Sequence, residues 1–225
     1  MSDHAHVHAH AAPSTPSPGA STPAWRLVAT LGLGGAVAGA LVAFVYERTL
    51  PAIQEYADAR IAGAVHEVLA APARLDTLYL VGDRLSRTPP PGVELRAVTK
   101  MFVGYDDAGV RTGVAVEASE PGFADEVKLM IGFDPATSTL TGYAVLGEKE
   151  TPGLGDKIEK DSAFGAQFAG KVAPLQGTKS AATGPSTVHT ITGATISSRA
   201  VIKIINNAVA LWQPRLAAFD SEATK

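Results

Sequence analysis

The hydrophobic pattern of this chain changes several times along its length, and the longest apolar stretch comes first. It runs from Leu27 to Tyr46 without a charged side chain. A helix of about twenty residues rises about 30 Å, the thickness of the hydrocarbon core of a bilayer. Trp25 and Arg26 precede the stretch and Arg48 follows it, as is typical of residues at a membrane interface. We therefore predict a membrane-spanning helix over residues 25–48.

Two other interpretations of this stretch stay open at the level of sequence. A buried helix of a soluble protein is equally apolar, although Gly32, Gly34, Gly35 and Gly39 would weaken one. The apolar core of a cleavable signal peptide is usually about 7–15 residues long and follows a short basic start. This stretch is longer and begins later, which favours an uncleaved anchor. Positive charges lie on both sides, so they do not decide its orientation.

An amphipathic pattern follows the apolar stretch. Between Pro51 and Ala70, apolar residues recur with helical spacing. They are Ile53, Tyr56, Ala57, Ile61, Val65 and either Val68 or Leu69. Pro72 is expected to end this helix, and the sequence TPPPG at 88–92 is typical of a loop. Residues 49–94 are therefore assigned to a helical connector followed by a loop.

Residues 95–147 carry β-rich runs separated by short turn sequences. MFVGYDDAGVRTGVAVEA contains an Asp-Ala-Gly turn between two such runs. VKLMIGFDPATSTLTGYAVLG repeats the pattern around DPATST. Since short turns connect antiparallel neighbours, this segment is predicted to form an antiparallel sheet.

The strongest helical signal after the sheet covers Ile196–Trp212, and Pro214 follows it. Its apolar stripe consists of Val201, Ile204, Ile205, Ala208 and Trp212. Strands followed by helices indicate an α+β fold on a single N-terminal membrane helix. We assign the domain to residues 95–215 and a C-terminal tail to residues 216–225.

Three polar segments connect the sheet to this helix. Glu148–Gly155 reads as a Gly/Pro loop, Asp156–Phe168 as a possible helix, and Gly177–Ser186 as a flexible connector.

Residues 1–24 contain mostly Ala, His, Pro, Ser and Thr. Such a segment buries too little apolar surface to offset its chain entropy, so it is predicted to be disordered. His4, His6, His8 and His10 alternate with small or apolar residues and could present imidazoles to a divalent metal. Nothing in the sequence supplies supporting ligands, and a solvated tail explains the same letters.

Composition excludes several functions. The formal net charge of −3 gives no reason to expect nucleic acid as a partner. The chain has no cysteine, which excludes disulfides, thiolate metal sites and cysteine nucleophiles.

The sequence HTITGATISS, residues 189–198, places many hydroxyl groups at the start of the predicted helix. Gly193 permits close approach of the backbone, and Ser197 or Ser198 can cap the helix. Free amides and the positive end of the helix dipole make such a start a suitable anion site. A plain capped helix start explains the same residues.

A second cluster, ETPGLG at 150–155, combines Pro152 with Gly153 and Gly155 and leaves Leu154 at the tip of a tight turn. An exposed leucine there would suit packing against a flat ligand or a partner. An ordinary loop with an inward leucine fits equally well.

Together, GEKETPGLGDKIEK and HTITGATISSRAV resemble the FMN-binding G subunit of Rnf-type electron-transport complexes. They resemble, more distantly, the C subunit of the sodium-pumping NADH:quinone reductase. The resemblance covers roughly Val98 to Val209, and the N-terminal anchor matches the family's layout.

The resemblance implies that FMN is bound covalently, through a phosphoester on Thr195, and that a dedicated FMN transferase forms this bond. The implied cofactor-binding residues are Thr192, Gly193, Ala194, Thr195, Ser197 and Ser198 in one motif and Glu150, Thr151, Gly153 and Leu154 in the other. The flavin would perform the redox chemistry, so neither a catalytic acid or base nor a metal is expected. The family commonly has an aspartate where this chain has His189.

The resemblance also implies a function and a location. The protein would be an electron carrier anchored in the bacterial inner membrane, with its FMN domain in the periplasm. Its partners would be the other membrane subunits of a complex that couples redox chemistry between ferredoxin and NAD to ion movement. Two alternatives are a stand-alone extracytoplasmic flavoprotein and a non-redox assembly module that has lost its cofactor.

Overall fold

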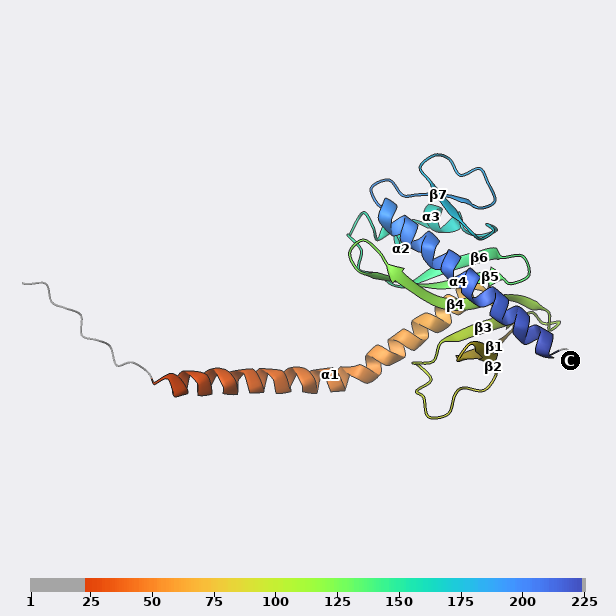
Figure 1. Ribbon diagram of the computed structural model, residues 1–225. Helices are drawn as coiled ribbons and strands as arrows, with labels where there is room; N and C mark the ends of the chain where they lie inside the picture. Colours follow the sequence, from red (N-terminus) through yellow and green to blue (C-terminus); the bar gives the residue numbers. More distant parts are fainter. Residues whose placement is uncertain (1–22, 224–225) are drawn as a thin grey trace, which may run out of the picture. The chain divides into compact units, whose positions relative to one another are not determined.

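The computed structural model describes residues 23–223 (Figure 1). They belong to two compact units, one ending at Ile53 and the other beginning at Gln54. One helix, α1 (Ala24–Val68), runs through both. The predicted disordered tail and its four histidines lie almost wholly in residues 1–22, outside the described residues.

The first unit contains the apolar part of α1. Its large side chains, among them Leu31, Val42 and Phe44, are exposed. The helix is long and apolar enough to cross a membrane, and its most apolar 18 residues are not buried by any other described part of the chain. Burial in a protein core formed by the described residues therefore does not account for this stretch.

The second unit is built on one six-stranded antiparallel sheet with the strand order β2-β1-β3-β4-β5-β6. The strands are β1 (Arg74–Val81), β2 (Arg84–Ser86), β3 (Lys100–Tyr105), β4 (Arg111–Pro121), β5 (Glu126–Asp134) and β6 (Thr139–Gly147). The antiparallel sheet and the α+β class are confirmed.

Turn chemistry explains the two hairpins that the sequence predicts. Between β3 and β4, Gly109 has φ 78° and its amide donates to the Asp106 carbonyl over 3.0 Å. Between β5 and β6, Asp134 Oδ1 accepts from the Ala136 amide over 2.9 Å. A glycine in the left-handed conformation, or an aspartate whose side chain accepts a hydrogen bond from the amide two residues later, commonly reverses the chain within a few residues.

Strands β1 and β2 lie inside the segment that the sequence analysis assigned to a helical connector and loop. A signal was present: the apolar run Leu78–Val81 ends at Gly82, which has φ 63°. That glycine turns the chain back, and Tyr79 then pairs with Ser86. The connector is therefore shorter than expected, and the sheet begins at Arg74.

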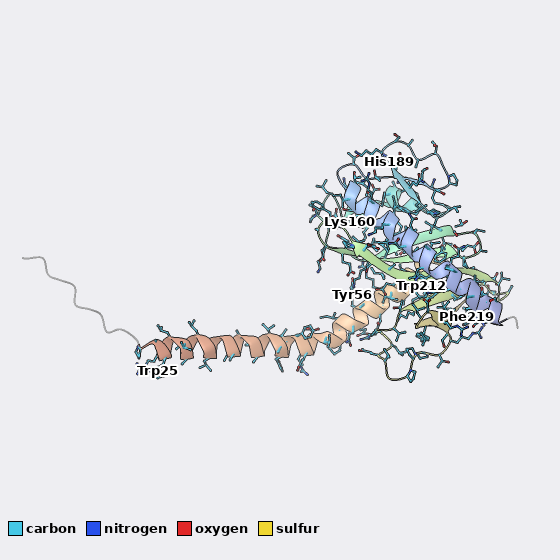
Figure 2. The ribbon with its side chains drawn as sticks, in the orientation of Figure 1. Trp25, Tyr56, Lys160, His189, Trp212 and Phe219 are labelled. Atoms are coloured by element: carbon cyan, nitrogen blue, oxygen red, sulfur yellow. The ribbon has the colours of Figure 1, made fainter. Side chains whose placement is uncertain are left out.

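Helices cover both faces of the sheet. On one face, side chains such as Val116 and Ile131 belong to the same buried cluster as Trp212 of α4 (Thr195–Ala223), which crosses the sheet (Figures 1 and 2). On the other face, Met130 packs with Val65 from the end of α1. Since neighbouring strand residues point to opposite faces, one strand supplies both layers.

Helix α4 differs from its prediction at both ends. All five residues of the predicted stripe are buried. However, the helix begins one residue earlier, at Thr195, and continues through Pro214 to Ala223, so residues 216–223 are helical. Tertiary contacts offset the cost of the proline: Leu216 is buried, and Asp220 accepts two hydrogen bonds from Arg111, over 2.7 and 2.8 Å.

The polar segments between the sheet and α4 form short elements. The possible helix over Asp156–Phe168 is two helices, α2 (Lys157–Lys160) and α3 (Ser162–Ala166), separated at Asp161, whose carboxylate caps α3. The expected flexible connector begins within β7 (Gln176–Thr178), which pairs in parallel with β8 (Thr187–His189). β8 leads into the turn that precedes α4.

Candidate functional site

The turn that precedes α4 is held by a serine side chain. The Ile191 amide donates to Ser198 Oγ over 3.0 Å, and Ser198 Oγ donates to the Ala194 carbonyl over 2.9 Å. Gly193, within this turn, has φ 84°. Ser198, which lies inside the first turn of α4, therefore ties the preceding turn to the helix through its side chain. It does not act as the expected N-terminal cap.

Ser197 is also buried and bonded. Its hydroxyl donates to Glu150 Oε2 over 2.5 Å, which joins the first turn of α4 to the loop after β6. Ser197 is therefore not a cap either, since the helix begins before it, at Thr195.

The hydroxyl groups of the motif thus divide into two classes. Ser197, Ser198 and Thr190 are buried and hydrogen-bonded within the protein. Thr192 is exposed and Thr195 is half-buried, and within residues 23–223 neither side chain forms a hydrogen bond. Thr192 and Thr195 are therefore the hydroxyls available to an external group.

The amides of the first helical turn are available as well. Those of Thr195, Ile196 and Ser197 donate to no acceptor in the described part of the chain, as expected where no preceding helical carbonyl exists. They lie at the positive end of the dipole of a 29-residue helix. An anion bound to Thr195 would thus meet both unused donors and a favourable potential.

The loop with the sequence ETPGLG lies directly against this turn. The Leu154 and Gly155 amides donate to the Thr151 carbonyl over 3.1 and 2.9 Å, which closes the loop. Leu154 stands at the tip and is 46% exposed. Its Cδ2 atom lies 3.2 Å from the position that a Cβ atom would take on Gly193. The two motifs, about forty residues apart in sequence, therefore form one site.

Glu150, predicted to contact a cofactor, points inward and is only 4% exposed. Besides Ser197, it accepts hydrogen bonds through Oε1 from the amides of Phe123 and Ala124, over 2.8 and 3.1 Å. One carboxylate thus connects the hairpin between β4 and β5, the ETPGLG loop and α4. Its position is that of a support beneath the site.

The Glu150 carboxylate remains ionised at neutral pH. Burial alone would raise its pKa, but hydrogen bonds from the Ser197 hydroxyl and from the backbone amides of Ala124 and Phe123 outweigh that effect. The pKa of Glu150 therefore lies below its usual value.

Phe123 also lies beside the site, and it was not among the residues predicted from the sequence. Its amide bonds to Glu150, which also bonds to Ser197, so the hairpin tip lies close to the first turn of α4. Its side chain is 65% exposed, and Ile196 on that turn is 54% exposed. The position of the aromatic residue in a Gly-Phe-Ala-Asp turn was the available signal. With Leu154, these residues place exposed apolar surface around Thr195.

His189 (Figure 2) ends β8 just before the motif. Gln167 holds its backbone: the His189 amide donates to Gln167 Oε1 over 2.9 Å, and Gln167 Nε2 donates to the His189 carbonyl over 3.4 Å. The backbone is therefore fixed independently of the side chain. Among residues 23–223 there is no group of His, Asp and Glu side chains suited to a metal ion.

Replacing Gly193 with alanine tests whether the turn requires its left-handed conformation. We expect a loss of ~1–2 kcal/mol in the free energy of unfolding, because φ 84° strains an L-residue and the new methyl group would press on Leu154. Chemical denaturation of the detergent-solubilised chain measures this. Gly165→Ala is the matched control, since open space surrounds that position. Equal stability of the two variants would contradict the expectation.

Comparison with known proteins identifies the family. Residues 122–210 match a family model described as "FMN-binding domain". This range includes the Phe123 hairpin, the ETPGLG loop and the first half of α4.

Two curated relatives match over most of their length. The chain is 30% identical over 184 residues to the G subunit of the ion-translocating oxidoreductase complex of Methanosarcina acetivorans, covering 82% of this chain and 92% of the relative. It is 29% identical over 189 residues to the protein of the same name from Shewanella baltica, covering 80% and 84%. A further relative is the G subunit of the Na(+)-translocating ferredoxin:NAD(+) oxidoreductase complex of Acetobacterium woodii, 29% identical over 119 residues, which cover 51% of this chain and 55% of that protein.

Solved structures share the fold. NqrC of Shewanella oneidensis has a TM-score of 0.54 at 18% identity, covering 65% of this chain and 85% of that structure. The C subunit of the Na(+)-translocating NADH-quinone reductase from Parabacteroides distasonis has a TM-score of 0.56 at 18% identity, covering 73% and 94%. The extent of the matches to the G subunits and the match to the FMN-binding domain lead to one conclusion: this chain belongs to the family of G subunits of Rnf-type ion-translocating oxidoreductase complexes.

Proposed function

We propose that this protein is a membrane-anchored electron carrier with FMN attached to Thr195 through a phosphoester bond. The observation that supports it best is the contact between Leu154 and the Gly193 turn, which unites the two motifs beside an available threonine hydroxyl. When bound, the flavin supplies the ability to accept and release electrons.

The residues around Thr195 fit such a group. Its phosphate end would meet the free amides of Thr195, Ile196 and Ser197, while the exposed side chains of Leu154 and Phe123 offer apolar surface to a flat ring. The roles of Thr192, Gly193 and Ala194 are to form the turn and present the hydroxyl. Glu150, Thr151 and Gly153 shape the opposing loop, and Ser197 and Ser198 hold the helix start.

Membership of the family supports a proposal for the partners and the location. We propose that the protein passes electrons between neighbouring membrane subunits of an Rnf-type complex, and that an FMN transferase loads Thr195. The exposed apolar surface of α1 supports a single membrane span over residues 25–48. By the family's layout, the FMN domain lies on the periplasmic side of the bacterial inner membrane.

Peptide mass spectrometry on the full chain co-expressed with an FMN transferase tests the proposal. The expected result is an increase equal to the mass of FMN minus that of water on the peptide containing Thr195. An unmodified peptide, alongside a control protein that is modified in the same cells, would contradict covalent attachment and would direct attention to His189.

Replacing Leu154 with alanine tests the contact with the ring. Because Leu154 is 46% exposed, the free energy of unfolding should change by less than about 1 kcal/mol. Fluorescence of the attached flavin should become more accessible to quenching by iodide. Val110→Ala, which truncates an exposed apolar side chain in the turn between β3 and β4, is the control. Equal quenching in the two variants would place the ring away from Leu154.

A further inference from the structure

Among the arginines in residues 54–223, Arg199 is distinguished by having no partner within that range. It is exposed on α4, and within residues 54–223 it forms no hydrogen bond, ion pair or aromatic contact. The others in this range each have one. Arg60, Arg74, Arg84, Arg96, Arg111 and Arg215 pair with carboxylates, and Arg87 lies over the ring of Phe219.

Helix geometry brings Arg199 to the side of Thr195. The two residues are four positions apart in α4, so they lie on the same face with Cβ atoms about 6 Å from each other. Long side chains on a helix lean toward its N-terminus and cover the preceding turn. The guanidinium group of Arg199 is therefore within reach of a group bonded to the Thr195 hydroxyl.

Two negative charges would lie close together at the start of α4 once Thr195 carries a phosphate, and a cation nearby would reduce their repulsion. Glu150, an ionised and buried carboxylate, already accepts a hydrogen bond from Ser197 in the first turn. A phosphate diester on Thr195 would add a second negative charge nearby, and the repulsion between two anions raises the cost of attachment. Lys203, the next cation along α4, is already engaged, since its ammonium group lies 2.7 Å from Glu120 Oε2.

We propose that Arg199 binds the phosphate oxygens of the group attached to Thr195 and offsets the repulsion from Glu150. A planar guanidinium group suits this task because it can donate two parallel hydrogen bonds to one phosphate. The inference rests on the proposed function, since it requires a phosphate on Thr195.

Arginine-selective labelling of the full chain with phenylglyoxal tests this contact directly. Labelling at Arg199, followed by peptide mass spectrometry, is compared between the flavin-carrying protein and the Thr195→Val variant. Attachment should slow the labelling of Arg199 about three- to tenfold, the range expected for a partly exposed charge-assisted contact. Arg74, which is exposed and belongs to β1, should label equally in both and serves as the internal reference.

A second measurement separates binding from simple shielding by the ring. The phosphorus NMR resonance of the attached phosphate should move in Arg199→Gln, and it should return toward the wild-type position in Arg199→Lys. It should stay unchanged in Lys203→Gln, which removes a cation two turns from Thr195.

The outcomes distinguish the two proposals. Wild-type protein without a modified Thr195 peptide overturns covalent attachment and this contact with it. If the wild-type protein is modified, two results would overturn the Arg199 contact alone. One is that Arg199 labels at the same rate as in Thr195→Val, and the other is that the phosphorus resonance is the same in Arg199→Gln as in the wild type.

Discussion

Replacing Thr195 with valine should abolish covalently bound flavin completely. Valine has nearly the shape of threonine but no hydroxyl, and the other hydroxyls near the helix start are either committed to internal hydrogen bonds or, in Thr192, placed on the preceding turn. The variant should fold normally, because the Thr195 hydroxyl forms no hydrogen bond within the described chain. Flavin fluorescence of the denatured protein band and the mass of the Thr195 peptide measure the loss.

Two controls make this result specific. Thr195→Ser restores a hydroxyl at the same position and should regain modification. Thr183→Val changes an exposed threonine in the connector and should be modified like the wild type. Flavin still attached in Thr195→Val would show that another hydroxyl, with Thr192 the first candidate, carries it.

Replacing Glu150 with alanine should destabilise the second unit by about 3 kcal/mol, because it leaves three donors without their acceptor and one of them, the Ser197 hydroxyl, is buried. These donors are the Ser197 hydroxyl and the amides of Phe123 and Ala124. Glu150→Gln keeps the volume and one acceptor oxygen, so about 1–2 kcal/mol is expected. Chemical denaturation of the full chain in detergent measures both. Glu126→Ala, an exposed change in the same hairpin, should cost less than about 1 kcal/mol.

The stabilisation from Glu150 should also depend on pH. Its pKa is lower in the folded than in the unfolded protein, so its contribution is fully present above the ordinary value of 4.5. It is lost as the pH falls through the lower folded value. The difference in stability between wild type and Glu150→Gln should therefore be constant near neutrality and vanish in acid. A difference that persists at low pH would show that shape, and not charge, decides the effect.

Local signals explain the part of the fold that sequence predicts correctly. The hairpins around Gly109 and Asp134 follow from the chemistry of residues within the turns themselves. The buried stripe of α4 follows from helical periodicity. Both depend on neighbours only a few positions apart, so a pattern along the chain is sufficient to find them.

Tertiary contacts explain what the sequence did not predict. The helix after Pro214 persists because Arg111, from a distant strand, binds Asp220. Strand β2 has only three residues and depends on pairing with β1.

The candidate site divides in the same way. Both motifs are visible as strings of residues, but their contact at Leu154 and Gly193, the inward direction of Glu150 and the nearness of Phe123 depend on packing between segments far apart in the chain.

The construction of α4 also determines how firmly Thr195 is held. Thr195 is the first residue of a helix whose body, from Val201 to Leu216, is locked into the core. Local opening of such an element requires most of the free energy of global unfolding, whereas exposed loops open at little cost. A group bonded to Thr195 is therefore held at one end by the packing of the whole domain, and the Glu150 carboxylate ties the opposing loop to the same helix through Ser197.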